Sequence, residues 1–114
     1  MQTDVERIGD VTVVTLHTEY LDASNAEDMR ESIASALVNC RKLVLDLSRV
    51  NFVDSRGCGA ILSCLRHVAG NGGDLKLCRI TPQVRSTLEL IRLHRICEIH
   101  ETRAEAVQSF QPHG

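Results

Sequence analysis

The sequence of 114 residues has very few aromatic side chains. It contains no tryptophan, one tyrosine and two phenylalanines: Tyr20, Phe52 and Phe110. Proteins that bind single-stranded nucleic acid stack bases on aromatic rings, and this chain has few rings to offer. Its 13 basic and 15 acidic residues give a net charge of −2, and no basic run is longer than Arg41-Lys42. We therefore expect an aliphatic core and no nucleic-acid partner.

Long apolar runs and paired cysteines are also missing. No stretch approaches the roughly 20 apolar residues that a membrane span needs, and residues 1–6 carry no cationic, apolar signal region. The five cysteines are an odd set without a C-x-x-C pair: Cys40, Cys58, Cys64, Cys78 and Cys97. Such thiols suit a reducing compartment, where they pack as small hydrophobic side chains. We expect a cytoplasmic protein that does not insert into membranes and has five free thiols.

Strand signals alternate with helix signals along one domain, residues 1–114, a length that is enough for an independent core. Gly9-Asp10 suits a tight turn between two β-rich segments, so the chain should open with a hairpin. The run at 43–47 is continuously apolar, which is typical of a strand covered on both faces. Five segments are predicted as strands: Val5–Ile8, Val11–Leu16, Leu43–Leu47, Leu75–Cys78 and Ile96–Ile99.

Capping signals mark the helices. Capping boxes at Ser24 to Glu27 and at Thr102 to Glu105 precede the first and last helices. Asp54 or Ser55 is available as N-cap of the second helix, and Thr81-Pro82 opens the third. Four segments are predicted as helices: residues 25–40, residues 55–69, residues 82–93 and a last one from residue 103. The alternation predicts an α/β fold with a mixed sheet of four to five strands and about four helices.

Ser55 stands where a buried strand and a short link give way to a helix. A helix N-terminus has unpaired N–H groups and a partial charge of about +0.5, so a phosphate on Ser55 would be held there. A serine at this position is more often an N-cap that stabilises its helix by about 1 kcal/mol. The residues alone leave both interpretations open.

Catalytic and cofactor chemistry is poorly supported, and we expect neither an enzyme nor a bound metal or cofactor. Ser55 lacks the glycine two residues earlier that a nucleophile elbow requires, and the Gly-Lys-Ser/Thr of a P-loop is absent. Cys64 and His67 share a helix face, but no second pair at ligand spacing accompanies them. A helix N-terminus can lower the pKa of a thiol, so a redox sensor at Cys58 is one alternative, although burial of Cys58 is favoured.

The segment from Asp46 to Leu62, DLSRVNFVDSRGCGAIL, resembles the signature of STAS domains, the family of bacterial anti-sigma factor antagonists. Three other segments resemble family elements in the right order: Leu21 to Ser24, Gly72 to Leu77 and Thr81 to Arg85. The resemblance covers nearly the whole chain. It implies a STAS-like sheet and a protein-binding function.

The same resemblance implies that Ser55 is phosphorylated by a partner anti-sigma factor acting as a serine kinase. Only the unphosphorylated form would bind that partner tightly, and a serine phosphatase would reset the cycle. Asp22 and Asp54 match aspartates that lie by the phosphorylation site in the family. Arg56 stands where the family usually has Ser or Thr, and it would pair with a phosphate or an acidic partner. Gly57 would let backbone N–H groups approach an anion.

Three departures from the family pattern leave an alternative open. Arg56 replaces the second serine of the family motif, Cys58 replaces a leucine, and Glu19 stands where a glycine is common. The alternative is a constitutive STAS scaffold, a subunit of a lipid transporter or of a signalling assembly, that uses the same surface without phosphate turnover.

Overall fold

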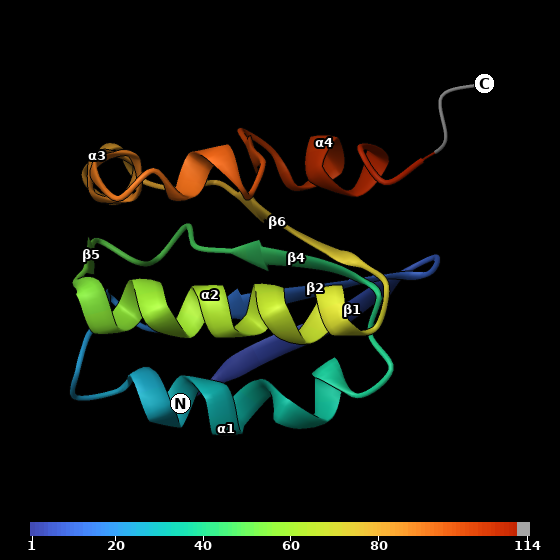
Figure 1. The fold of residues 1–114 in the computed structure, drawn as a ribbon, viewed down its shortest axis with the longest axis horizontal. Coiled ribbons are helices and arrows are strands. Elements are labelled where there is room, and N and C mark those ends of the chain that lie inside the picture. Colours follow the sequence, from blue (N-terminus) through green and yellow to red (C-terminus); the bar gives the residue numbers. More distant parts are fainter. Residues whose placement is uncertain (112–114) are drawn as a thin grey trace.

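A five-stranded mixed sheet forms the centre of the computed structural model, which describes residues 1–111 (Figure 1). The strand order is β1-β2-β4-β6-β7, in which β1 pairs antiparallel with β2 and the other neighbours are parallel. The hairpin and the mixed sheet that the sequence predicts are confirmed. The strands are β1 (Thr3–Ile8), β2 (Val11–Leu16), β4 (Lys42–Asp46), β6 (Asp74–Cys78) and β7 (Ile99–His100).

Helices cover both faces of this sheet. The helices are α1 (Ala26–Leu37), α2 (Ser55–Gly70), α3 (Pro82–Leu90), the 3-10 helix η1 (Leu93–Arg95) and α4 (Arg103–Gln108). α1 and α2 pack together on one face, and α4 contacts β4, β6 and β7 on the other (Figure 1). The central strands β2 and β4 are therefore buried on both sides, which explains why most of their residues are apolar.

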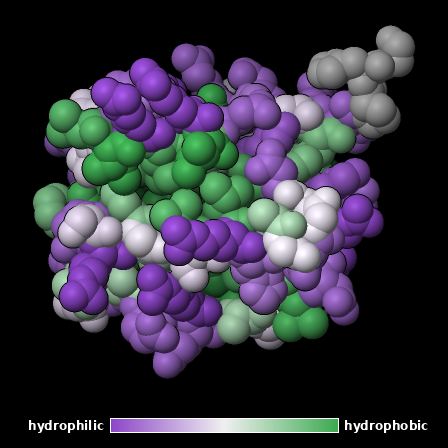
Figure 2. Space-filling model, in the orientation of Figure 1, coloured by the Kyte–Doolittle hydropathy of each residue, from purple (hydrophilic) through white to green (hydrophobic). Residues whose placement is uncertain are grey.

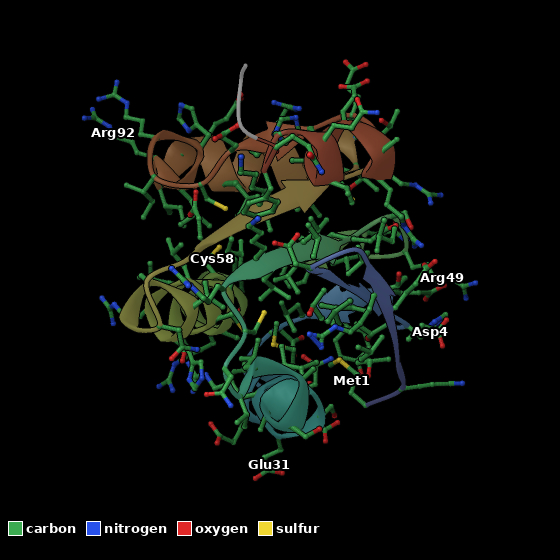
Figure 3. The ribbon with its side chains drawn as sticks, turned by 90° about the vertical axis from the view of Figure 1, so that its right-hand side faces the viewer. Met1, Asp4, Glu31, Arg49, Cys58 and Arg92 are labelled. Atoms are coloured by element: carbon green, nitrogen blue, oxygen red, sulfur yellow. The ribbon has the colours of Figure 1, made fainter. Side chains whose placement is uncertain are left out.

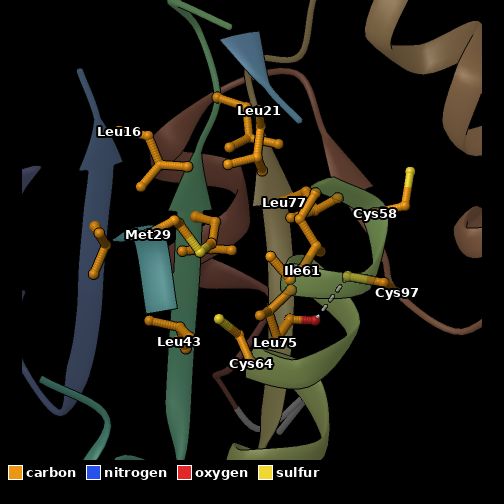
Figure 4. Packing of buried hydrophobic residues seen from close by; sticks show 14 of the residues in the cluster. Leu16, Leu21, Met29, Leu43, Cys58, Ile61, Cys64, Leu75, Leu77 and Cys97 are labelled. Atoms are coloured by element: carbon orange, nitrogen blue, oxygen red, sulfur yellow. Dashed lines mark hydrogen bonds between the residues drawn. The ribbon is translucent and has the colours of Figure 1, made fainter. Parts of the chain in front are cut away.

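The two faces of β4 contribute to separate hydrophobic cores. Leu43 and Leu45 pack under α1 and α2 with Met29 and Ile61, as Figure 4 shows for several members of this cluster. Val44, whose side chain points the other way, packs with Ala106 and its neighbours under α4. This alternation follows from the period of two along a strand. Both cores are almost entirely aliphatic, as the scarcity of aromatics predicts.

A second, two-stranded parallel sheet lies at the end of the molecule where α2 begins. It joins β3 (Tyr20–Leu21) to β5 (Phe52–Val53). Leu21 and Val53 are buried, whereas Tyr20 and Phe52 face outward. Neither strand was predicted, because two residues are too few to show a periodic pattern.

Several predicted boundaries are corrected by the structure. The first helix ends at Leu37 instead of Cys40, since Asn39 adopts φ 60° and turns the chain. The third ends at Leu90, because Arg92 adopts φ 62° ahead of η1. The last strand is Ile99–His100 and excludes Ile96, which is exposed.

The two capping boxes have different outcomes. Thr102 Oγ1 accepts a hydrogen bond from Glu105 N at 3.0 Å, so the predicted cap of the last helix is confirmed. The cap at Ser24 is wrong, because Asn25 occupies the N-cap position and Ser24 Oγ donates to Asp22 instead. Within residues 1–111, no helix is both long and apolar enough to cross a bilayer.

Candidate functional site

Ser55 is the first residue of α2, and its side chain is exposed. It directly follows β5 and Asp54, so the small sheet β3-β5 sets its position at one end of the molecule. Within residues 1–111 its hydroxyl forms no hydrogen bond, which leaves it available to a partner. The N-cap is Asp54 and not Ser55. Of the two cap assignments that the sequence left open, the structure selects Asp54.

Asp54 holds the beginning of α2 against the segment that follows β3. Its Oδ1 accepts a hydrogen bond from Gly57 N at 2.9 Å, and its Oδ2 accepts one from Ala23 N at 3.2 Å. Asp54 N donates to the carbonyl oxygen of Leu21 at 3.2 Å. The hydrogen bond from Gly57 is the main reason that the pKa of Asp54 lies below its usual value. The carboxylate is therefore ionised beside Ser55 at neutral pH.

Asp22 shapes the turn that leads into α1. Its Oδ1 accepts hydrogen bonds from Ser24 N at 2.9 Å and from Ser24 Oγ at 2.6 Å. Its own N–H donates to Asn25 Oδ1 at 2.9 Å, and its carbonyl accepts from Ala26 N at 2.9 Å. The bond from Ala23 to Asp54 connects this turn to the start of α2. The structure thus places the two predicted aspartates on adjoining segments.

Gly57 has a packing role that the sequence did not indicate. A Cβ at this position would lie closer to the Leu21 carbonyl and to the Val53 side chain than van der Waals contact allows. Only glycine lets α2 approach β3 and β5 this closely. The Gly57 N–H is already bound by Asp54, so it is not free to hold an anion as the glycine pattern had suggested.

Arg56 and two aromatic residues complete the exposed surface around Ser55. Arg56 is exposed, and its guanidinium forms no ion pair within the described residues. Tyr20 and Phe52 are paired across β3 and β5 and are 46% and 55% exposed. The sequence did not indicate that these two rings lie at the surface, because strands of two residues are too short to show an alternating pattern.

The environment of Cys58 does not activate its thiol. The residue is 5% exposed. Burial raises the pKa of the Cys58 thiol, and the nearby Asp54 carboxylate raises it further. A reactive thiol needs a lowered pKa and access to solvent. The expected burial of Cys58 is therefore confirmed, and the redox alternative gains no support.

Groups that could hold a metal are not assembled in the described part of the chain. Within residues 1–111, no three His, Cys, Asp or Glu side chains lie close enough together to hold an ion. Cys64 is buried and His67 is exposed. The exposed groups around Ser55 form a surface suited to contact with another protein.

Comparisons with known proteins agree with this geometry. The STAS domain family matches residues 2–106. An anti-sigma F factor antagonist from Paenibacillus polymyxa is 27% identical over 113 residues, which cover 97% of this chain and 96% of the relative. The crystal structure of TM1081 from Thermotoga maritima is similar with a TM-score of 0.84 and 27% identity, over 96% of this chain and 95% of that one.

Two solved structures of the anti-sigma factor antagonist SpoIIAA have the same fold. The unphosphorylated form has a TM-score of 0.75 at 23% identity, with 95% of each chain covered. The phosphorylated form, from Bacillus, has a TM-score of 0.71 at 22% identity, with 96% of this chain and 100% of that chain covered.

Proposed function

The chain belongs to the STAS domain family, and from that premise we propose that it is an anti-sigma factor antagonist switched by phosphorylation of Ser55. The observation that carries the proposal is the position of Ser55, an exposed hydroxyl at the first residue of a 16-residue helix whose cap is supplied by Asp54. A relative in Paenibacillus polymyxa is named an anti-sigma F factor antagonist. The existence of SpoIIAA in two phosphorylation states further supports it.

The start of α2 is able to carry a phosphate without rearrangement of the fold. Ser55 is on the surface, and its side chain has no bond in residues 1–111 that a phosphate would break. The N-terminus of α2 attracts negative charge, and the exposed Arg56 guanidinium adjoins the site. The ionised Asp54 opposes this attraction. Because attraction and repulsion offset each other within the protein, the main effect of the phosphate would be on the binding of a partner at this surface.

The switch works through charge and bulk at the interface. A phosphate adds about −1.5 to −2 charges, which changes the net charge from −2 to about −3.5 to −4. Unphosphorylated, the protein binds an anti-sigma factor through the surface around Ser55 and the Asp22 turn. After phosphorylation, electrostatic and steric conflict lowers the affinity. The partner supplies kinase activity and ATP, and a serine phosphatase restores the binding form.

Two variants of Ser55 test the switch. The partner is first isolated with tagged protein from its native cell and identified, and its affinity is then measured by titration calorimetry. Ser55→Ala should remain bound and resist ATP-dependent phosphorylation. Ser55→Asp should bind at least about tenfold more weakly, because its fixed charge partly mimics phosphate. Ser35→Ala, an exposed helical serine on α1, is the control and should behave like the parent.

Intact-mass measurement of protein from the native cell separates the switch from its alternatives. Phosphoserine adds about 80 Da. An unmodified mass under all growth conditions supports a constitutive scaffold in a transporter or signalling assembly. Equal affinity of both Ser55 variants, with phosphate still appearing on Ser55→Ala, contradicts the assignment of Ser55.

A further inference from the structure

The corner where α3 ends and η1 begins exposes three large apolar side chains. Leu90, Ile91 and Ile96 are 84%, 51% and 57% exposed. Figure 2 shows hydrophobic side chains gathered on the face between α2 and this corner. Single exposed apolar residues are common on protein surfaces, but a group of them marks an interaction site. We refer to residues 90–96 as the α3–η1 corner.

The α3–η1 corner has an excess of unpaired positive charge. Arg92 and Arg95 are exposed, and neither forms an ion pair within residues 1–111. Arg92 projects away from the molecule in Figure 3. The nearby acids already have partners, since Glu89 lies 3.9 Å from Arg85, and Glu98 lies 3.3 Å from Lys76. An approaching acidic group would therefore meet two free guanidinium groups.

The backbone at Arg92 is strained for an arginine. Its φ is 62°, and its N–H donates to the Glu89 carbonyl at 3.0 Å, at the helix end where glycine is favoured. Two other non-glycine residues share a positive φ. Asn39 tolerates this conformation, and the Arg79 side chain binds the buried Asp46. Within the described residues, the Arg92 side chain forms no hydrogen bond or ion pair that accounts for an arginine there, and such strain is typical of functional positions.

From the apolar patch, its unpaired cations and the strained Arg92, we propose that the α3–η1 corner binds an acidic amphipathic helix of a protein partner. The apolar face of that helix packs on Leu90, Ile91 and Ile96, and its carboxylates pair with Arg92 and Arg95. The inference goes beyond the Ser55 switch and does not depend on it. In Figure 3, Arg92 and α2, which carries Cys58, lie toward the same side of the molecule, so one partner can reach both surfaces.

A membrane surface is the less well supported occupant. Lipid-binding segments typically carry about four to eight basic residues, whereas the α3–η1 corner presents two unpaired arginines. Two cations beside three exposed apolar side chains instead suit one short acidic amphipathic helix.

The test uses two synthetic helical peptides that have the same leucine face and carry either glutamates or lysines on the other face. Binding is followed through the backbone amide signals of isotope-labelled full-length protein. The glutamate peptide should shift the signals of residues 90–96 and bind at least about tenfold more tightly than the lysine peptide, with an affinity that falls as salt is added. The absence of saturable binding, equal binding of both peptides, or shifts confined to another surface overturns the proposal.

Matched variants test whether the Arg92 side chain binds the glutamate peptide. Arg92→Glu should weaken binding of the glutamate peptide about tenfold. Arg49→Glu makes the same charge change at an exposed arginine far from Arg92 (Figure 3) and should leave the affinity within about threefold of the parent. Arg92→Gly should raise the melting temperature while it weakens binding, because it removes both the strain and the guanidinium. An Arg92→Gly protein that binds as well as the parent contradicts the role of Arg92.

Two further measurements distinguish this proposal from the Ser55 switch and from membrane binding. Ser55→Asp should bind the glutamate peptide as the parent does, so a failure of the Ser55 switch and a failure of this proposal give different results. Vesicles of anionic phospholipid should cause no comparable shifts at residues 90–96. If they bind there more strongly than the peptide, the corner is a membrane contact and the proposal is wrong.

Discussion

At the scale of single residues, Asp54 and Ser55 have separate roles at the start of α2. Asp54 accepts the hydrogen bonds of Gly57 N and Ala23 N, whereas the Ser55 hydroxyl points to solvent. Asp54→Ala should lower the melting temperature by several degrees, because two N–H groups lose their acceptor. Ser55→Ala should change the free energy of unfolding by less than about 0.5 kcal/mol. Thermal melts of both variants check this difference, and a larger loss for Ser55→Ala contradicts the cap assignment.

Two glycines of α2 offer a second comparison at the residue scale. A Cβ on Gly57 would collide with the Leu21 carbonyl, whereas a Cβ on Gly59 would meet only Arg30 Nη2, at 3.9 Å. Gly57→Ala should therefore cost about 1–3 kcal/mol through overpacking. Gly59→Ala should be neutral or stabilise by up to about 1 kcal/mol, since alanine favours helix. Denaturant midpoints measure both, and equal effects at the two positions would show that α2 does not approach β3 as closely as described.

At the scale of elements, the buried Asp46 links the end of β4 to α4. Its Oδ2 accepts hydrogen bonds from Arg103 Nη2 at 3.1 Å and from Arg79 Nη1 at 3.3 Å, and its Oδ1 accepts one from Ser48 N at 3.0 Å. Arg103 also bonds Glu6 and Thr15. Burial by itself raises the pKa of Asp46, but the bonds from Ser48 and Arg103 and the charge of Arg79 lower it below its usual value. The network therefore depends on an ionised carboxylate.

This network predicts a specific dependence of stability on pH. A carboxyl whose folded-state pKa is lowered stabilises the protein above its unfolded-state pKa of about 3.9, and the contribution is lost as the pH falls through the folded-state pKa. Asp46→Asn should cost at least about 1–3 kcal/mol at pH 7 and should lose less stability than the parent on acidification. Urea midpoints measured from pH 7 to pH 3 check this. Asp10→Asn, at an exposed ion pair with Lys42, is the control and should shift the midpoint only slightly.

At the scale of the whole molecule, the two hydrophobic cores share one sheet. β4 contributes Leu45 to the core under α1 and α2 and Val44 to the core under α4. We predict that residues 1–114 form a single domain that unfolds in one transition, with equal calorimetric and van't Hoff enthalpies. Leu45→Ala should cost about 2–5 kcal/mol without splitting that transition. Val38→Ala, at a side chain that is 65% exposed, should have little effect. Two resolved transitions would disprove the single domain.

Local sequence signals were sufficient for the order of the main elements and for the location of Ser55. The hairpin at Gly9, the apolar strand at Leu43 and the cap signal at Thr102 each depend on a few neighbouring residues, whose propensities and turn chemistry agree with the final fold. The placement of Ser55 at a helix start followed from the same kind of signal. Short-range physics decides such features before any distant segment is in place.

Contacts between segments that are far apart in the sequence decided the features that local signals did not predict. The second hydrogen bond of the Asp54 carboxylate comes from Ala23 N, 31 residues earlier, and the need for Gly57 depends on the Leu21 carbonyl. Sequence position suggested a lowered pKa for Cys58, but packing in the core raises it. The exposure of Leu90 and Ile91 depends on where α3 ends and on how it packs against β5 and η1. The sequence alone therefore determined the order of the main elements and where Ser55 lies among them. Only the tertiary structure decided which groups are buried, bonded or exposed, because burial and hydrogen bonding depend on neighbours that the chain brings together by folding.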